Sequence, residues 1–529
     1  MGTHEKRGVR VRKRRFAAGA ALAVSAVSLT SGPAHAASVG ITLTTQIGGD
    51  AGALGVTAIA VVPASPSIET FTYNFGDGTT ITCGNADPDP DCAEFGGVTT
   101  LSLDGSHYYA KPGTYQVTFT MTVANGDTST ATTSVTTQGS DYTPYGPTRI
   151  LDTRKGTGVA KAAPVPANGT VRLKIAGNGS IPSNVTAVAL NITVVSPTRS
   201  GYAEVYPDGS PRPAVSNVNF GPGQTIANSI IVPVTDGYVD LVNASAGSTE
   251  LLADVTGYFS QVAASGYTPL TPDRLLDTTK GIGAAKGALP ADKSLSLTVA
   301  GADDGQLPSS GITAVVLNVT VTQATGNGDL TAYPGGKPKP GTSNLNFKAG
   351  DVRAASVLVP VGADGKIDIA NGGSTGATQV LADVAGYFSA DSTNSYVPAA
   401  ATRVVDTRKN LGDYGQCVAI DMAQLPGGPD DVAALITNMT VTQTESSGWL
   451  AEVPSYDGPG GGGSHDCDDL NPTTSNVNWT GPNTTVANFG IATPAKDDSV
   501  AFYFNDSAGS PPELIVDAFG YFADDANPA

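Results

Sequence analysis

A chain of 529 residues is too long to fold around one hydrophobic core, so we expect roughly three to five domains. Charged residues make up only 14% of the chain and the formal net charge is −18, which argues against nucleic acid and anionic membrane surfaces as partners. Outside the N-terminus, no helical periodicity is sustained, and short Val- and Thr-rich runs are broken by Gly, Pro, Asn and Asp. Such runs indicate strands, and the predicted fold class is all-β.

Residues 1–36 have the pattern of a secretory signal peptide. Seven basic residues lie between Lys6 and Arg15, a run of small apolar residues follows, and Ala34-His35-Ala36 has the small-x-small form that signal peptidase needs. The mature chain would carry a net charge of −24, because the segment holds seven basic residues and one acidic residue. We therefore expect a secreted protein, extracellular or associated with the cell wall. No second apolar stretch predicts a membrane span.

Residues 38–138 are expected to form the first domain. Two runs of alternating apolar residues within it each adjoin a turn that contains glycine. The stretches 73–78 and 107–117 resemble, in order, the two motifs of the polycystic kidney disease (PKD) domain, with Tyr73 in place of the family's Trp and Asn74 in place of its Asp. The resemblance covers about 100 residues. It implies an immunoglobulin-like β-sandwich.

An insertion in this domain holds three carboxylates in alternation between two cysteines. Cysteines of an exported chain are expected to pair, and pairing within domains joins Cys83 to Cys92 and Cys417 to Cys467, with the two other connectivities left open. Alternating Asp oxygens could coordinate calcium, although the glycine turn and distal Glu of an EF-hand are missing. A solvated acidic loop is the alternative. The candidate calcium ligands are Asp87, Asp89 and Asp91.

From residue 142 onward the chain carries three copies of one sequence unit. Each copy has a tyrosine seven residues before an Arg-x-x-Asp-Thr motif and ends on Asp-x-x-Gly-Tyr-Phe. The period of 125 and then 129 residues is that of a whole domain, and it far exceeds the roughly 20–50 residues of a solenoid repeat. We therefore expect three further domains, each with its own core, at residues 142–260, 267–389 and 396–523.

Each copy is predicted to contain eight strands. Eight short strand candidates within about 115 residues favour a two-sheet sandwich or a jelly-roll-like unit. A β-trefoil is the alternative, but no threefold sub-repeat is visible within a copy. The links at 260–266 and 389–395 are short, which indicates an elongated rod rather than a loose chain. The expected architecture is a tandem array of β-sandwich domains.

The three copies resemble a repeat found in exported proteins of high-GC Gram-positive, Streptomyces-like soil bacteria. There the opening Pro-x-Arg-Leu-Leu-Asp-Thr-Arg and the closing Asp-Val-x-Gly-Tyr-Phe mark units that are attached to wall enzymes or stand alone. The third copy departs from this pattern at Ala401 and Ala518. The resemblance covers about 380 residues and implies a surface or cell-wall context without naming a ligand.

The arginine and the aspartates of these motifs are expected to hold each unit together. An arginine in an apolar strand needs a partner if it is buried. The partner is either the aspartate three residues later, such as Asp152, or the aspartate of the closing motif, which would place the first and last strands side by side. The structural pairs expected from the second arrangement are Arg149 with Asp254, Arg274 with Asp383, and Arg403 with Asp517.

No motif in the sequence predicts an active site. His107 lies in a turn motif and His465 in a Gly-rich loop, and no Gly-x-Ser-x-Gly, His-Glu-x-x-His or phosphate-loop motif occurs. We therefore expect a protein that is not an enzyme and requires no cofactor. Three shared asparagines match the Asn-x-Thr glycosylation pattern, which we interpret as accidental in strands: Asn191, Asn318 and Asn438.

Two functions are compatible with the sequence. The first is a secreted binding or adhesion protein for polysaccharide, cell wall or protein surfaces. The second is a structural spacer of the cell surface, and an accessory part of an extracellular hydrolase is a lesser alternative. Trp479 replaces Phe220 and Phe347 of the other copies, which favours a core role, so Trp449 is the candidate ligand-binding residue. Exposure of Trp449 would favour binding, and burial would favour the spacer.

Overall fold

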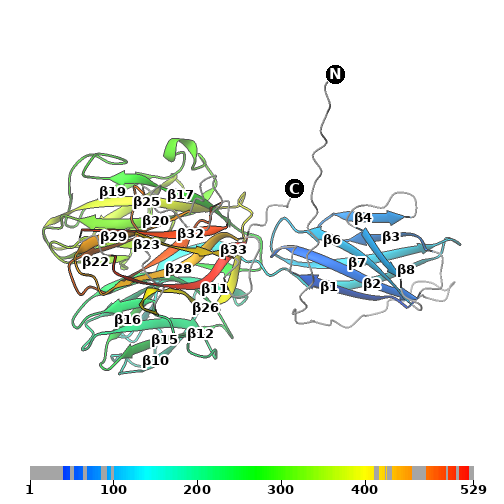
Figure 1. The fold of residues 1–529 in the computed structure, drawn as a ribbon, viewed down its shortest axis with the longest axis horizontal. Helices are drawn as coiled ribbons and strands as arrows, with labels where there is room; N and C mark the ends of the chain where they lie inside the picture. Colours follow the sequence, from blue (N-terminus) through cyan, green and yellow to red (C-terminus); the bar gives the residue numbers. More distant parts are fainter. Residues whose placement is uncertain are drawn as a thin grey trace, which may run out of the picture. The chain divides into compact units, whose positions relative to one another are not determined.

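The computed structural model of the protein describes residues 40–47, 53–63, 68–84, 92–96, 100–409, 416–422, 425, 432–454, 472–495, 498–507 and 511–523, without the side chains of 84 and 92–100. The regular elements in these ranges are strands and short 3-10 turns, which confirms the all-β prediction (Figure 1). The described chain forms two compact units. One contains 40–46, 57–106 and 116–134, and the other contains 135–523 together with short segments near 54 and 110.

The N-terminal domain is a β-sandwich of two four-stranded sheets, ordered β1-β2-β6-β5 and β4-β3-β7-β8. Tyr73, at the position of the PKD tryptophan, is fully buried; its hydroxyl donates to the Leu103 carbonyl at 2.5 Å and accepts the Ala60 amide at 3.0 Å. Because Tyr73 lies on β3 and its partners lie on β6 and β2, this side chain joins the two sheets. The strands are β1 Thr42–Ile47, β2 Gly55–Pro63, β3 Ile68–Asn74, β4 Thr80–Gly84, β5 Cys92–Gly96, β6 Thr100–Tyr108, β7 Thr114–Val123 and β8 Thr128–Thr136.

The first repeat unit is a jelly roll with an inner sheet, β14-β11-β16-β9, and an outer sheet, β10-β15-β12-β13. Counted along the unit, these orders are 6-3-8-1 and 2-7-4-5, the arrangement of two interlocked Greek keys. The prediction of eight strands in two sheets is confirmed. The strands are β9 Asp141–Asp152, β10 Thr170–Lys174, β11 Val185–Val195, β12 Gly201–Pro207, β13 Val218–Phe220, β14 Ile226–Pro233, β15 Tyr238–Ser245 and β16 Glu250–Ser260.

The second and third repeat units have the same topology. Their inner sheets are β23-β20-β25-β17 and β31-β28-β33-β26, and their outer sheets are β19-β24-β21-β22 and β27-β32-β29-β30. A short additional strand, β18 (Leu289–Pro290), pairs with β25 in the second unit. The second unit has β17 Gly266–Asp277, β19 Ser294–Thr298, β20 Ile312–Thr322, β21 Gly328–Pro334, β22 Leu345–Phe347, β23 Arg353–Pro360, β24 Lys366–Asn371 and β25 Ala377–Ser389. The third has β26 Tyr396–Asp406, β27 Cys417–Asp421, β28 Val432–Thr442, β29 Ser447–Pro454, β30 Val477–Thr480, β31 Val486–Ala492, β32 Ser499–Asp506 and β33 Glu513–Ala523.

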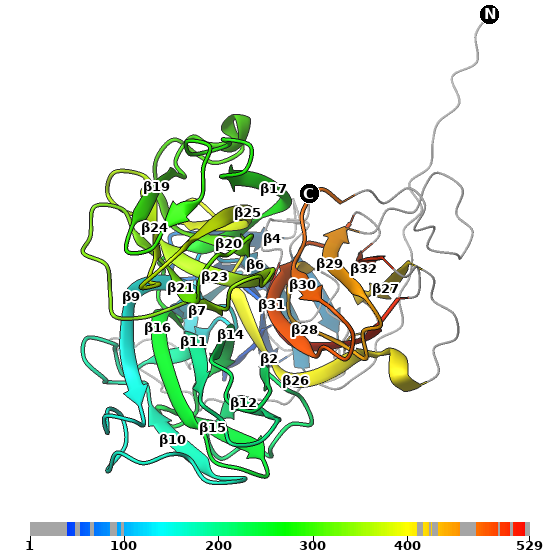
Figure 2. The same cartoon turned by 90° about the vertical axis from the view of Figure 1, so that its left-hand side faces the viewer.

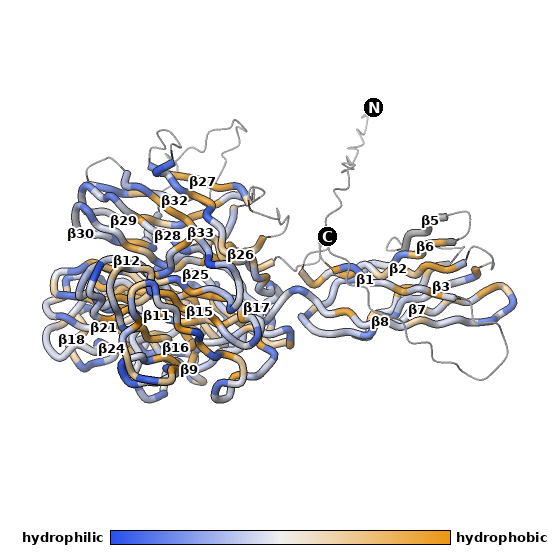
Figure 3. Tube along the Cα trace, turned by 90° about the horizontal axis from the view of Figure 1, so that it is seen from below, coloured by the Kyte–Doolittle hydropathy of each residue, from blue (hydrophilic) through white to orange (hydrophobic). Residues whose placement is uncertain are grey.

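Inner and outer strands differ in sequence because they face different surroundings. Strand β11 reads VTAVALNITVV and is buried on both faces, whereas β10 reads TVRLK and alternates exposed and buried residues. A sheet that is covered on both faces needs nearly continuous apolar strands, and a sheet with one face in water alternates. Figure 3 shows the hydrophobic stretches following the strands and the hydrophilic ones following the loops. Neighbouring repeat units cover the second face of each inner sheet.

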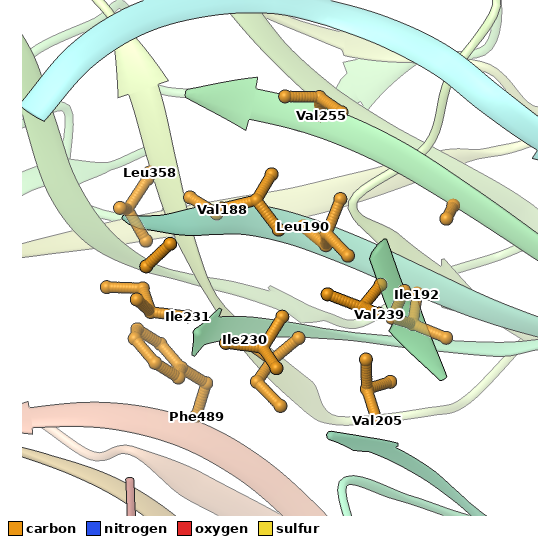
Figure 4. Packing of buried hydrophobic residues seen from close by; sticks show 14 of the residues in the cluster. Val188, Leu190, Ile192, Val205, Ile230, Ile231, Val239, Val255, Leu358 and Phe489 are labelled. Atoms are coloured by element: carbon orange, nitrogen blue, oxygen red, sulfur yellow. The ribbon is translucent and has the colours of Figure 1, made fainter. Parts of the chain in front are cut away.

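The three repeat units surround a common centre (Figure 2). Strands β14, β23 and β31, the edge strands of the three inner sheets, contact one another there. Buried residues of all three units belong to one cluster, in which Leu358 of the second unit and Phe489 of the third lie beside Ile231 of the first (Figure 4). The expectation of an elongated rod is therefore wrong for the repeats. Each repeat unit has a core of its own, and the three units are packed into one body, which we call the repeat body.

The links between the units close this arrangement into a ring. The amide of each opening tyrosine donates to a carbonyl two residues before the opening tyrosine of the next unit, and the third unit is bonded to the chain before the first. The bonds run from Tyr142 to Ser265 (2.8 Å), from Tyr267 to Asn394 (2.9 Å) and from Tyr396 to Ser140 (2.9 Å). The short links, which suggested a rod, instead hold neighbouring units in contact.

The closing Asp-x-x-Gly-Tyr-Phe motif supplies the aromatic part of the centre. Its phenylalanines, one from each unit, have ring centroids 5.8 to 6.3 Å apart: Phe259, Phe388 and Phe522. Each is also packed against the opening tyrosine of another unit at 4.3 to 4.8 Å: Tyr142 on Phe388, Tyr267 on Phe522 and Tyr396 on Phe259. A Cβ added at Gly257 would come within 2.1 Å of the Tyr142 ring, so only glycine fits beneath it. The contacts relate the units by a pseudo-threefold axis.

Candidate functional site

An arginine–aspartate pair, which we call the clasp, connects the first and last strands of every repeat unit. The two residues face each other directly in the β9/β16, β17/β25 and β26/β33 registers. Arg149 donates from Nε and Nη2 to the two Asp254 carboxylate oxygens at 2.8 and 2.9 Å. Arg403 and Asp517 form the same pair at 2.8 and 3.2 Å, and so do Arg274 and Asp383. The aspartates are at most 3% exposed, so the geometry is that of a buried, bidentate structural pair.

The aspartates of the opening and closing motifs are in different electrostatic environments. Burial raises the pKa of the three clasp aspartates although an arginine faces each of them: Asp254, Asp383 and Asp517. At the opening motif, the bonds from Arg408 lower the pKa of Asp406 to about 2, and Arg154 lowers that of Asp152. The second unit has Thr279 in place of this second arginine. The opening pair is therefore a peripheral feature, and the clasp is common to all units.

Three buried asparagines join the units to one another. The Nδ2 group of each donates to a backbone carbonyl of the next unit: Asn191 to Ser343 (2.7 Å), Asn318 to Ser475 (2.5 Å) and Asn438 to Ser216 (2.6 Å). These are the residues of the Asn-x-Thr pattern, and interpreting them as chance matches missed their role. Their presence in every copy, together with the shared Ser-Asn-x-Asn motif, was the available signal.

Several predicted site residues lie outside the described part of the chain. They are the calcium candidates Asp87, Asp89 and Asp91, the side chain of Cys92, Cys467, His465 and the segment 1–36. Cys83 and Cys417 are buried, at 3% and 6% exposure, and their pairing stays a prediction. Within the described ranges, no group of three or more His, Cys, Asp or Glu side chains could hold a metal ion.

The two tryptophans of the third unit lie on opposite faces of its outer sheet. Trp479, on β30, is 3% exposed and faces the interior, at the position of the phenylalanines in the other units. Trp449, on β29, precedes the fully buried Leu450 and therefore points to the outer face, where it is half-buried. The exposure of Trp449 is therefore intermediate: it is less than the open position that would favour binding and more than the buried position that would favour a spacer.

Tyr503 on β32 accompanies Trp449 on that outer face. In the register of β29 and β32, Tyr503 faces Ala451, two residues from Trp449 on the same side of the sheet. The two rings have centroids 5.9 Å apart at an interplanar angle of 38°. Both side chains are half-buried, so each leaves part of its ring accessible. We call this pair the aromatic face of the third unit.

The comparison with known families bears on the first domain. Residues 42–137 match the family model of the PKD domain. This stretch is similar to PKD domains in sequence. The PKD match covers less than one-fifth of the chain, and it does not extend to the repeats. The likeness of the repeats to exported Gram-positive proteins stays a prediction.

The other comparisons add little. No curated protein matches the chain. One solved structure, described as the structural basis for the promiscuous specificity of carbohydrate-binding modules from the β-sandwich superfamily, is 13% identical over 42% of this chain and 97% of its own, at a TM-score of 0.16. A likeness this weak carries no argument about what the chain binds. None of the described residues form a helix that could cross a membrane.

Proposed function

We propose that the chain is a secreted, non-enzymatic protein that binds an extracellular polysaccharide through the aromatic face of its third repeat unit. The signal-peptide pattern and the PKD domain support the location, since PKD domains occur in extracellular proteins. A closed ring of jelly rolls offers outer sheets to solvent as rigid platforms. Binding by such a platform needs neither a metal ion nor a catalytic residue.

The observation that carries this proposal is the pairing of Trp449 with Tyr503. Indole and phenol rings offer large apolar faces, and their polar tips tolerate water, so they suit partly wet contacts. Sugar rings expose C–H groups on their flat faces and pack on such side chains. Aromatic residues at the Trp449 position are not needed by the fold, because the second unit has Asp329 there.

Binding to purified cell-wall material and to insoluble polysaccharides tests the proposal. The mature chain should sediment with at least one of these polymers. Trp449→Ala should weaken that binding about three- to tenfold, the loss expected when one aromatic contact is removed. Tyr202→Ala, at the equivalent position of the first unit, is the matched control and should bind as the unaltered chain does.

Two results would contradict the proposal. Unchanged binding by a correctly folded Trp449→Ala protein would remove the aromatic face from the interaction. Turnover of a glycan or peptide substrate that is lost on changing one Asp or Glu would make the chain an enzyme.

A further inference from the structure

A cavity of about 430 Å³ lies where the three repeat units meet at one end of the pseudo-threefold axis. The first residues of β14, β23 and β31 line it: Ile226, Arg353 and Val486. The loops before these strands and the strands β13 and β30 complete the wall. Its volume is within the range of roughly 300–1,000 Å³ that small-molecule sites occupy in proteins.

Arg353 breaks the symmetry of this cavity. The three lining residues are equivalent, because Ile226, Arg353 and Val486 face Val194, Val321 and Val441 in the same register of their inner sheets. The first and third units therefore fill the position with an apolar side chain, and the second unit fills it with a cation. Packing does not demand the arginine, since the sister units pack without it, and the partial removal of its charge from water, to 21% exposure of the side chain, is costly.

The charge of Arg353 is incompletely compensated. Its acidic neighbour Asp351 has Oδ2 at 4.0 Å from Nε, and the same oxygen accepts the Lys348 amide at 2.9 Å. Nη1 of Arg353 is buried and has no hydrogen-bond partner in the described part of the chain. Burial lowers the pKa of the guanidinium, and Asp351 only partly opposes this effect. A buried donor that is left unpaired costs stability unless a ligand accepts from it.

Trp479 adds a second unpaired donor to the same wall. Its side chain is 3% exposed, and its Nε1 has no acceptor among the described residues. Phenylalanine occupies this position in the first two units, and phenylalanine has no N–H group. The two departures from the sister units, at 353 and at 479, are therefore both residues that line this cavity and that carry an unsatisfied N–H donor.

The remaining wall is suited to hydroxyl groups. It carries amide and hydroxyl side chains together with the apolar Phe220 and Ile226; the polar members include Asn219, Gln224, Asn478, Asn483 and Thr484. A guanidinium fork matches a carboxylate in a bidentate manner. We propose that this cavity binds an acidic sugar, whose carboxylate contacts the guanidinium of Arg353 and whose hydroxyls contact the amide and hydroxyl side chains of the wall.

Fluorescence of the mature chain measures this binding directly. Trp449→Phe leaves Trp479 as the only tryptophan, so a change in emission reports on the cavity. Glucuronate should change that emission saturably and should raise the melting temperature of the repeat body. Glucose, which lacks the carboxylate, and acetate, which lacks the hydroxyls, should have little effect at the same concentration. Arg353→Val in this background should weaken the glucuronate response at least about tenfold.

Arg353→Val keeps the test valid because Val486 already occupies the equivalent position in the third unit. The variant is expected to fold, and melting without ligand checks this. The proposal is overturned by the absence of a saturable glucuronate response, by an equal response in Arg353→Val, or by glucose or acetate binding as tightly as glucuronate. Polymer binding at the aromatic face is measured with Trp449→Ala, so the two proposals fail independently.

Discussion

At the scale of single residues, one missing side chain leaves the asparagine network between the units incomplete. Asn228 donates from Nδ2 to Oδ1 of Asn438 at 2.8 Å, and Asn488 donates in the same way to Asn318 at 2.9 Å. The third member of this set would donate to Asn191. Its position, which faces Val319 on β20, is occupied by Ala355, and Oδ1 of Asn191 is buried without a partner.

Ala355→Asn is therefore expected to stabilise the repeat body. The new amide would donate to Asn191 and to the backbone, as Asn228 does to the Asn217 carbonyl at 2.7 Å. Satisfying a buried polar atom is worth about 1–3 kcal/mol, which would raise the melting temperature by a few degrees. Differential scanning calorimetry measures the shift. Asn228→Ala, which creates the same defect between the first and third units, should lower the melting temperature, and a lower value for Ala355→Asn would contradict the idea.

Glu452 is a second residue whose environment predicts a measurable effect. It lies between the two sheets of the third unit, where the other units have Val205 and Ala332, and its Oε1 accepts from the Thr437 hydroxyl at 2.8 Å. Burial raises the pKa of this carboxyl from 4.5 to about 8. The folded chain therefore holds a proton that the unfolded chain has released between these two values.

The free energy of unfolding should consequently fall as the pH rises from about 4.5 to about 8. The contribution is fully present below the lower value and is lost at the upper one, with a slope of up to about 1.4 kcal/mol per pH unit. Glu452→Gln keeps the shape and the hydrogen bond to Thr437 but does not titrate. Urea unfolding at pH 5, 6.5 and 8 should show a smaller decrease for Glu452→Gln. Parallel pH profiles would show that Glu452 does not hold the proton.

At the scale of elements, the clasp explains why each unit begins and ends with a shared motif. The first and last strands of a jelly roll are neighbours in the inner sheet although they are more than a hundred residues apart in the chain. Pairing them closes the unit, and the arginine and the aspartate lie on facing residues. The glycine and phenylalanine of the closing motif do not take part in the clasp. They pack against the opening tyrosine, and the phenylalanine also lies near the pseudo-threefold axis.

Arg149→Ala should destabilise the repeat body by on the order of 3 kcal/mol, because Asp254 would stay buried without its partner. The units share a centre, so the loss should appear in the melting of the whole body. Arg154→Thr is the control, since the second unit already has threonine at this position and Arg154 is 39% exposed. Its cost should stay below about 1 kcal/mol. Equal melting temperatures for Arg149→Ala and the unaltered chain would refute a structural clasp.

The strands of a unit could be predicted from the sequence, but the packing of the units could not. Glycine, proline and asparagine turns separate the strands, and this signal is local. An apolar strand such as β11 needs cover on its second face, but its own sequence does not show whether that cover comes from the same unit or from a neighbour. The contrast between continuous β11 and alternating β10 carried the information. Comparison of the copies points to Trp449 by sequence alone, whereas the equivalence of Arg353 with Ile226 and Val486 is clear only from the registers of the three inner sheets.

At the scale of the whole molecule, the repeat body resembles a homotrimer joined into one chain. Each contact between units recurs cyclically, as the tyrosine–phenylalanine stacks and the asparagine bonds show. An interface in which different surfaces meet head to tail generates a closed ring when the rotation is one-third of a turn. If the interfaces alone suffice for closure, the covalent links serve to let the three copies differ, as they do at 353, 355 and 479.

This view predicts that the first unit alone associates into trimers. Residues 139–262 contain the groups that make the contacts between units, including Tyr142, Phe259, Asn191 and Asn228. A trimer of this unit would place three copies of Ile226, and no arginine, at the position of Arg353. The second unit differs, because three copies of Arg353 would repel one another at the axis and Ala355 would leave three asparagine oxygens unpaired. Sedimentation equilibrium should therefore give a trimer for 139–262 and weaker association for 264–391. A first unit that is folded and monomeric at micromolar concentration would mean that the links, rather than the interfaces, hold the ring together.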